Sequence, residues 1–289
     1  MKKLYLMLHL AVFLAGFTGV FGKMISLNES PLVWYRVLFS SIILCIGLKL
    51  YNVKKLSSFK EIFGISKIGL LITVHWIFFY ASIKYSNISI GVVCFCLTSF
   101  FTAIFEPLIN KKKFSPVQLL LSAMTLIGIS FIFHFDSSYQ LGIAFGVASA
   151  AFAALYTIFN ERLVRSYDAK LINYYQMMGG TIGLGIILPM FYYLNPEQRF
   201  IPTATDTVYL ILLALFCTVA LYVMVAEVLK KLSAFTVNLT YNLEPIYSII
   251  IAFLFFNEGK EVNFSFYIGL IFVLLSVVLQ SVISLKQRL

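Results

Sequence analysis

The chain has 289 residues, of which 61% are hydrophobic and only 12% are charged, and its net charge is +10. A soluble domain carries about 25% charged residues, and half of that share would not cover its surface. The composition therefore excludes a soluble globular enzyme, a disordered protein and a secreted disulfide scaffold. It is typical of an all-α polytopic membrane protein, in which each crossing of the bilayer uses about 20 apolar residues.

Ten apolar runs are long enough to cross a bilayer, and short polar turns separate them. The runs fall at residues 4–22, 32–50, 64–83, 88–109, 116–135, 141–159, 171–194, 207–226, 234–256 and 264–285. A cleaved signal peptide is the alternative for the first run, because Lys2 and Lys3 precede it, but the run is long for one. We therefore predict ten transmembrane helices and no large domain outside the membrane.

The basic residues predict the orientation of these helices. If the N-terminus is cytoplasmic, 17 of the 22 Lys and Arg residues fall on the inner side and five on the outer side. By the positive-inside rule, this predicts an even number of spans with both termini in the cytoplasm. The positive charge then marks loops that meet anionic lipid, and we expect no nucleic-acid partner.

The order of the spans indicates an internal repeat with a shift of about 140 residues. Residues 15–21 resemble residues 153–159, residues 32–36 resemble residues 172–176, and residues 98–99 can be aligned with residues 244–245. Five spans are an odd number, so a second copy enters the membrane upside down. This predicts two inverted five-helix repeats, residues 1–137 and 138–289, with a substrate site near the middle of the membrane between them.

Short motifs recur at fixed places in these spans. They are Pro31-Leu32 followed by Arg36, residues 81–86, Leu243-Glu244-Pro245, Asn257-Glu258-Gly259, Gly128 and Gly269. With them, the whole chain resembles the EamA-type ten-span carriers of the drug/metabolite transporter (DMT) superfamily. The resemblance implies a secondary carrier of the bacterial cytoplasmic (inner) membrane that works by alternating access. Export is the direction we expect, and import is the alternative.

Glu244 is the strongest candidate for a functional residue, because a carboxyl group near the middle of the membrane is costly and usually faces the interior of the bundle. Asn238 and Tyr241 lie on the same face of the predicted helix. Pro245 has no N–H, so the helix should break there and free the carbonyl of Tyr241. Glu244 could then bind substrate or a coupling proton, and a purely structural carboxyl at a kink is the alternative.

Arg36 is the second candidate and lies about one turn inside the outer end of its span. It could hold a substrate carboxylate or pair with Glu244, or it could extend to the lipid headgroups. Gln176 takes the equivalent position in the other repeat. Trp34 adds an aromatic surface beside Arg36, unless it is an ordinary interface anchor.

The remaining candidates for substrate binding are His75, Tyr80, Tyr156 and Asn160. A lone His in an apolar helix is more often a packing residue than a proton relay. Tyr156 and Asn160 share a helix face with Gly142, Gly146, Ser149 and Ala153, a stripe that favours close helix packing. Glu106 and Glu227 lie near lysine clusters at span ends, where we expect ion pairs.

No motif indicates an enzyme. The three histidines lack metal-binding spacing, and a P-loop is missing, so we expect neither a metal nor another cofactor. A passive channel and an intramembrane enzyme remain alternatives. An acid, a base and aromatic surfaces at one site suit an amino acid as substrate. The expected partners are this small molecule and the lipid bilayer, and the sequence is compatible with a homodimer.

Overall fold

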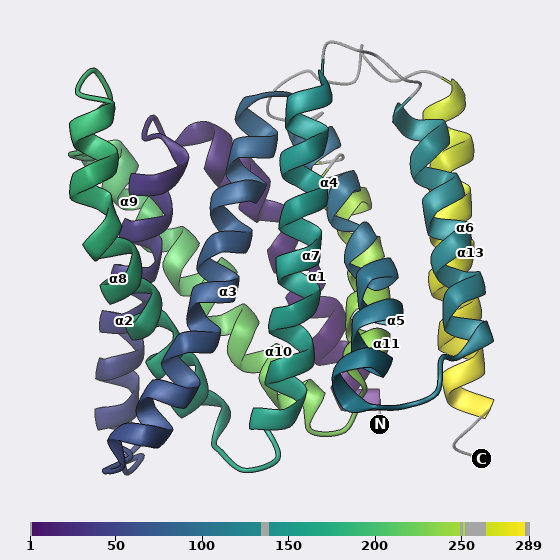
Figure 1. Ribbon diagram of the computed structural model, residues 1–289, viewed down its shortest axis with the longest axis horizontal. Helices are drawn as coiled ribbons and strands as arrows, with labels where there is room; N and C mark the ends of the chain where they lie inside the picture. Colours follow the sequence, from purple (N-terminus) through teal and green to yellow (C-terminus); the bar gives the residue numbers. More distant parts are fainter. Residues whose placement is uncertain (1, 134–138, 249–250, 252–263, 287–289) are drawn as a thin grey trace.

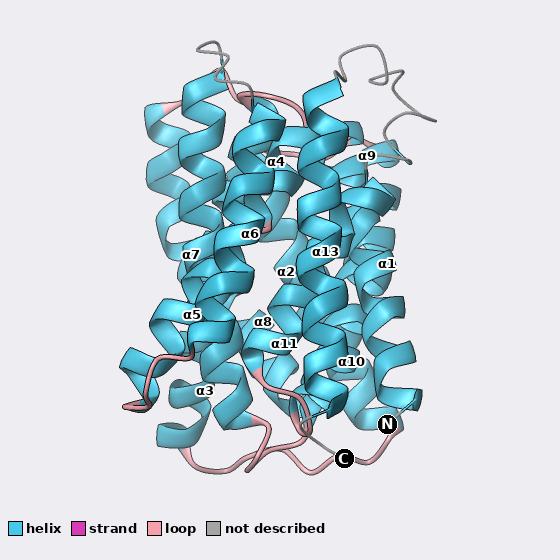
Figure 2. Ribbon diagram, turned by 90° about the vertical axis from the view of Figure 1, so that its right-hand side faces the viewer, coloured by secondary structure: helices cyan, strands magenta, loops and turns pink. Residues whose placement is uncertain are grey.

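The computed structural model describes residues 2–133, 139–248, 251 and 264–286. The motif at residues 257–259, the end of the ninth predicted run and His134 lie outside the described residues. Helices form almost all of the part that is described, and most of them run along one direction (Figures 1 and 2). The first helix begins and the last one ends at the same end of the bundle, which we call the terminal end; the opposite end is the far end.

The helices follow the predicted spans closely. They are α1 Lys2–Met24, α2 Glu29–Leu50, α3 Phe59–Lys84, α4 Ile88–Phe95, α5 Leu97–Asn110, α6 Pro116–Phe133, α7 Gln140–Leu163, α8 Ala169–Leu194, α9 Ala204–Ala214, α10 Leu221–Leu229, α11 Ala234–Thr240 and α13 Phe264–Lys286. Within the described ranges, seven helical segments are long and apolar enough to cross a membrane, and α6 and α13 contain shorter apolar stretches. The protein is therefore an all-helical, multi-pass membrane protein.

Side-chain caps fix where several helices begin. Asn87, Thr203 and Ser233 each accept a hydrogen bond from the backbone N–H three residues later, and Asp168 accepts one from the N–H of Lys170. Such caps satisfy amide groups that have no partner inside the helix. The boundaries therefore follow from local chemistry in the turns as well as from the length of the apolar runs.

Three of the predicted spans are not continuous α-helices. A turn at Cys96 separates α4 from α5, a π-helical segment at Leu215–Ala220 joins α9 to α10, and a 3-10 turn at Tyr241–Leu243 follows α11. In that 3-10 turn, the backbone N–H of Glu244 donates to the carbonyl of Tyr241. The tighter turn supplies the partner that Pro245 cannot, so this carbonyl is not free for a ligand.

Glycines hold α3 against two helices that lie far away in the sequence. A Cβ atom on Gly69 would lie 2.1 Å from the carbonyl oxygen of Gln176, and one on Gly179 would lie 2.3 Å from that of Ser66. These contacts join α3 to α8, and α7 packs along α3 in the same bundle (Figure 1). On α7, a Cβ on Gly146 would lie 2.4 Å from the Cβ of Cys94. The stripe that includes Gly146 therefore serves close packing, as predicted.

Candidate functional site

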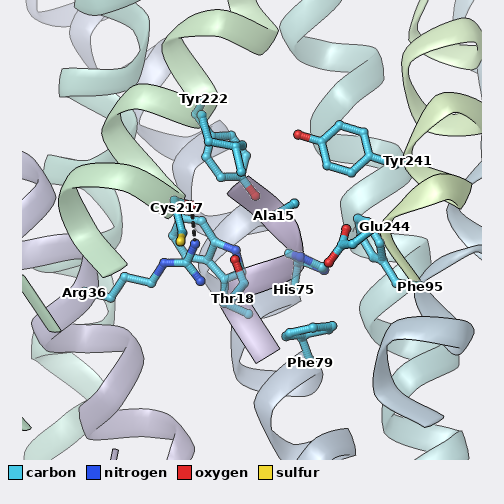
Figure 3. A pocket seen from close by; sticks show the side chains of 12 residues that line it. Ala15, Thr18, Arg36, His75, Phe79, Phe95, Cys217, Tyr222, Tyr241 and Glu244 are labelled. Atoms are coloured by element: carbon cyan, nitrogen blue, oxygen red, sulfur yellow. Dashed lines mark hydrogen bonds between the residues drawn. The ribbon is translucent and has the colours of Figure 1, made fainter. Parts of the chain in front are cut away.

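A small cavity lies among the helices of the bundle (Figure 3). Its walls come from both halves of the chain: Ala15, Thr18, Arg36, His75, Trp76, Phe79, Phe95, Cys217, Leu221, Tyr222, Tyr241 and Glu244. The centres of water molecules can reach about 20 Å³ of it, and about 30 Å³ of a second cavity that shares four of these residues. A few waters fit this space. The residues that line the first cavity and bear charge, Arg36 and Glu244, are both buried.

Arg36 is buried in this site, and three of its five N–H groups donate to protein acceptors, so it does not extend to the headgroups. Its Nε donates to Thr218 Oγ1 at 2.8 Å, Nη1 to the Tyr80 hydroxyl at 2.9 Å, and Nη2 to the carbonyl oxygen of Cys217 at 2.8 Å. The guanidinium also lies 3.8 Å from the centre of the Trp76 ring. These contacts replace the hydrogen bonds to water that the guanidinium group loses when it is buried.

The π-helical segment presents two of these acceptors to Arg36. An α-helix uses each carbonyl for an amide four residues later, whereas a π-helix contains an extra residue in the turn and displaces its carbonyls. Cys217 and Thr218 both lie in this segment, and Thr218 Oγ1 also donates to the carbonyl of Leu213. The irregular turn therefore provides a binding site for a guanidinium inside an apolar helix.

Glu244 lies across the cavity from Arg36, as Figure 3 shows. Its side chain is 3% exposed. No ion pair joins it to Arg36, and among the described residues no hydrogen bond holds its carboxyl group. An acid and a base thus face the same small space without neutralising each other directly, which leaves both able to bind a ligand with two charges.

His75 is fixed by Ser149 of α7. Its Nδ1 lies 3.0 Å from the carbonyl oxygen and 2.8 Å from the hydroxyl of Ser149, whose Oγ donates to the carbonyl of His75. When Nδ1 carries the proton and donates to that carbonyl, Nε2 is the free acceptor of the ring. His75 is therefore both a packing residue, in contact with the Phe95 ring at 5.2 Å, and part of the cavity wall.

The other polar candidates lie beside the second cavity rather than the first. The Tyr156 hydroxyl donates to Gln176 Oε1 at 3.0 Å, and Gln176 Nε2 donates to Asn160 Oδ1 at 2.7 Å. Asn238 Nδ2 donates to Thr102 Oγ1 at 2.8 Å. Only Tyr156 and Asn238 of this group line the second cavity, while Gln176 and Asn160 support it from behind.

Trp34 does not reach either central cavity. It lies near the far end, where its Nε1 donates to the carbonyl of Thr181 at 3.1 Å. Four residues complete the site and are not among the predicted candidates: Trp76, Tyr222, Cys217 and Thr218. Thr218 could have been noticed as a hydroxyl in the middle of an apolar run. The other three resemble ordinary residues of a transmembrane helix.

Hydrogen bonds link the helices at both ends of the bundle. At the far end, Asp206 accepts from the N–H of Ser26 at 2.8 Å and from its hydroxyl at 2.7 Å, and Lys84 donates to the carbonyl of Leu27. At the terminal end, Arg162 donates to Asn110 Oδ1 at 2.9 Å. We call the Asp206–Ser26 contact the far latch and the Arg162–Asn110 contact the terminal latch.

Three further contacts at the terminal end involve acidic residues. Glu161 Oε2 accepts from the N–H of Ala234 at 3.0 Å, which ties α7 to the beginning of α11. Glu106 pairs with Lys112 at 3.2 Å, and Glu227 pairs with Lys230 at 2.7 Å. The ion pairs predicted for Glu106 and Glu227 are thus confirmed.

Comparison with known proteins gives one consistent result. The model of the EamA-like transporter family matches residues 2–134 and again residues 140–282. An uncharacterized transporter of Haemophilus influenzae is 24% identical over 276 residues, 89% of this chain and 86% of the relative. The uncharacterized transporter YdfC of Bacillus subtilis is also 24% identical, over 87% of this chain and 82% of its own length. A solved crystal structure with 12% identity covers 98% of both chains with a TM-score of 0.71, which shows that the fold is shared.

Proposed function

Because the chain belongs to the EamA-like transporter family, we propose that it is a secondary carrier that exports a small zwitterionic metabolite, such as an amino acid, by alternating access. The observation that carries this proposal is that Arg36 and Glu244 face each other across the central cavity (Figure 3). A zwitterion would place its carboxylate on the guanidinium and its ammonium group on the carboxylate. The substrate leaves chemically unchanged, so the protein is a carrier and not an enzyme.

The proposed topology has ten spans, with both termini in the cytoplasm and the protein in the inner membrane. The uneven distribution of basic residues supports it. The two matches of the family model support a repeat, which we divide into residues 1–137 and 138–289. In this arrangement Arg36 comes from the first repeat and Glu244 from the second, so substrate binds between two inverted halves.

Transport by purified protein in liposomes tests the proposed substrate class. Vesicles loaded with one unlabelled amino acid at a time should accumulate the same labelled compound by exchange, and the rate should saturate with concentration. Glu244→Gln should lower this exchange about tenfold or more, because a neutral amide loses the charge-assisted contact with the ammonium group. Glu227→Gln is the matched control, since Glu227 pairs with Lys230 away from the cavity. Ion currents in place of saturable exchange would indicate a channel, and a chemically altered product would indicate an enzyme.

Glu244 is also the proposed carrier of a coupling proton. In this proposal, an imposed proton gradient drives net uptake into vesicles by the native protein. Glu244→Gln cannot release a proton, so the gradient should no longer drive uptake even where some exchange remains. A variant that keeps full gradient-driven uptake would disprove the coupling role and leave substrate binding to be judged from the exchange assay.

A further inference from the structure

A third and larger cavity lies at the far end of the bundle, between α2, α8 and the loop that follows α8. The centres of water molecules can reach about 390 Å³ of it. Its lining is almost entirely apolar and aromatic: Trp34, Gly185, Leu188, Pro189, Tyr192, Phe200 and Ile201. It shares no residue with the two central cavities, so the proposed transport site does not account for it.

Specific contacts give this cavity its shape. The ring of Phe200 lies 5.9 Å from that of Trp34, 5.8 Å from that of Tyr35 and 6.1 Å from that of Tyr192, measured between ring centres. Gly185 leaves room at the wall, because a Cβ atom there would lie 3.1 Å from Trp34 Nε1. The aromatic rings therefore line the cavity, and the absence of a side chain at Gly185 adds to its volume.

The surroundings of the cavity indicate an apolar occupant. Three neighbours on α8, Ile186, Ile187 and Met190, are 74%, 60% and 67% exposed, as is expected for residues that face lipid. Water does not stably fill an apolar cavity, since it would lose its hydrogen bonds there. Trp and Tyr gather where the hydrocarbon of a bilayer meets the headgroups. A lipid acyl chain entering from this level is the occupant with matching chemistry.

The loop that contributes Phe200 and Ile201 to the cavity also carries a positive charge. Arg199 directly precedes Phe200, is exposed, and forms no ion pair with any residue that the structure describes. A guanidinium binds phosphate oxygens through two parallel hydrogen bonds. Glu197 lies two residues away with the opposite charge, so both side chains must enter the test.

We propose that this cavity binds one acyl chain of an anionic phospholipid, whose phosphate group lies on Arg199. The site is independent of the proposed substrate and of the direction of transport. It shares α2 with the central site, because Trp34 lines the lipid cavity and Arg36 lines the central one. A bound lipid would therefore restrict the movement of the helix that carries Arg36.

The two tryptophans of the chain make this proposal measurable. Trp34 lines the cavity, whereas Trp76 is 1% exposed in the centre of the bundle. Brominated acyl chains quench tryptophan only at short range. In mixed vesicles with the same total bromine content, brominated phosphatidylglycerol should quench the protein several-fold more effectively than brominated phosphatidylcholine. Trp34→Phe should remove this difference.

Four further variants separate the contributions of cavity and charge. Gly185→Leu fills the cavity and should abolish the preference for phosphatidylglycerol, whereas Gly47→Leu, on α2 with no atom within 4 Å of an added Cβ, should retain it. Arg199→Gln should remove the preference and Glu197→Gln should increase it.

Two results would overturn the proposal. One is equal quenching by both lipids in the native protein. The other is an unchanged preference in Arg199→Gln, a change at an exposed position that should not affect folding. Protection of Trp34 from both lipids in a dimer would show that a second copy fills the cavity, which also overturns it.

Discussion

Arg36 illustrates how a charged side chain is accommodated in the interior of a helical membrane protein. A guanidinium inside a membrane bundle is tolerated only when several acceptors replace its water. Here, Thr218, Tyr80 and the carbonyl of Cys217 do so, and the Trp76 ring covers one face of the group. Because these partners come from both halves of the chain, removal of the guanidinium group should affect the whole central site.

Arg36→Lys should therefore be a severe change although it keeps the charge. An ammonium group cannot reproduce three directed contacts and a stacked plane at once. We expect substrate exchange to fall about tenfold or more, and the free energy of unfolding to fall by about 2 kcal/mol. Exchange in liposomes and a thermal unfolding curve measure the two effects. Arg165→Lys, an exposed residue of the terminal end that pairs locally with Glu161, is the control. Native exchange by Arg36→Lys would contradict the role given to the guanidinium.

The sequence predicts part of this site and for a clear reason. Arg36 and Glu244 are charges within apolar runs, and such charges seldom face lipid, so both could be identified before the fold was known. The carbonyl of Cys217 could not be predicted, because its availability depends on backbone geometry and not on residue type. Trp34 was assigned to the central site by its closeness to Arg36 in the sequence, but two residues along a helix point in different directions.

At the scale of elements, hydropathy predicts the spans well and their irregularities poorly. The run at residues 207–226 contains neither Gly nor Pro and is predicted as one helix, yet it includes a six-residue π-helical segment. The break near Pro245 was predicted, because proline removes a donor in every context. The π turn depends instead on tertiary contacts with Arg36, which no local pattern in the sequence records.

Two glycines of α3 provide a matched test of the packing between α3 and α8. Gly69→Ala places a methyl group against the backbone of Gln176 and should lower the free energy of unfolding by about 1–3 kcal/mol. Gly64→Ala meets no atom within 4 Å and should be neutral or raise stability by about 0.5–1 kcal/mol through helix propensity. Thermal unfolding in detergent compares them. Equal effects of the two changes would mean that the close approach does not determine stability.

At the scale of the whole molecule, contacts at both ends enclose the central cavities. The far latch joins the beginning of α9 to the α1–α2 turn, and the terminal latch joins α7 to the end of α5. Alternating access requires that one end opens while the other stays closed. The sequence predicts the spans but not the two latches, because hydrogen bonds between distant polar residues depend on the packed fold.

Cys217 can report which end opens, because it lines the central cavity and is 1% exposed. In a variant that keeps Cys217 alone of the four cysteines, Asp206→Asn should weaken the far latch and increase its labelling by a membrane-impermeant maleimide several-fold. The increase should occur from the far-end side only. Arg162→Ala should have the opposite sidedness. Labelling that rises equally from both sides in either variant would show that the contacts stabilise the fold without controlling access.

The glycine contacts of α3 determine which parts of the chain can exist separately. In sequence α3 belongs to the first repeat, but its backbone lies against α8, and Gly146 of α7 lies against Cys94 of the neighbouring α4. Each repeat therefore completes its core with helices of the other. If the gene were divided at the connection between α6 and α7, the two polypeptides should be degraded when produced separately and should accumulate as a complex when produced together.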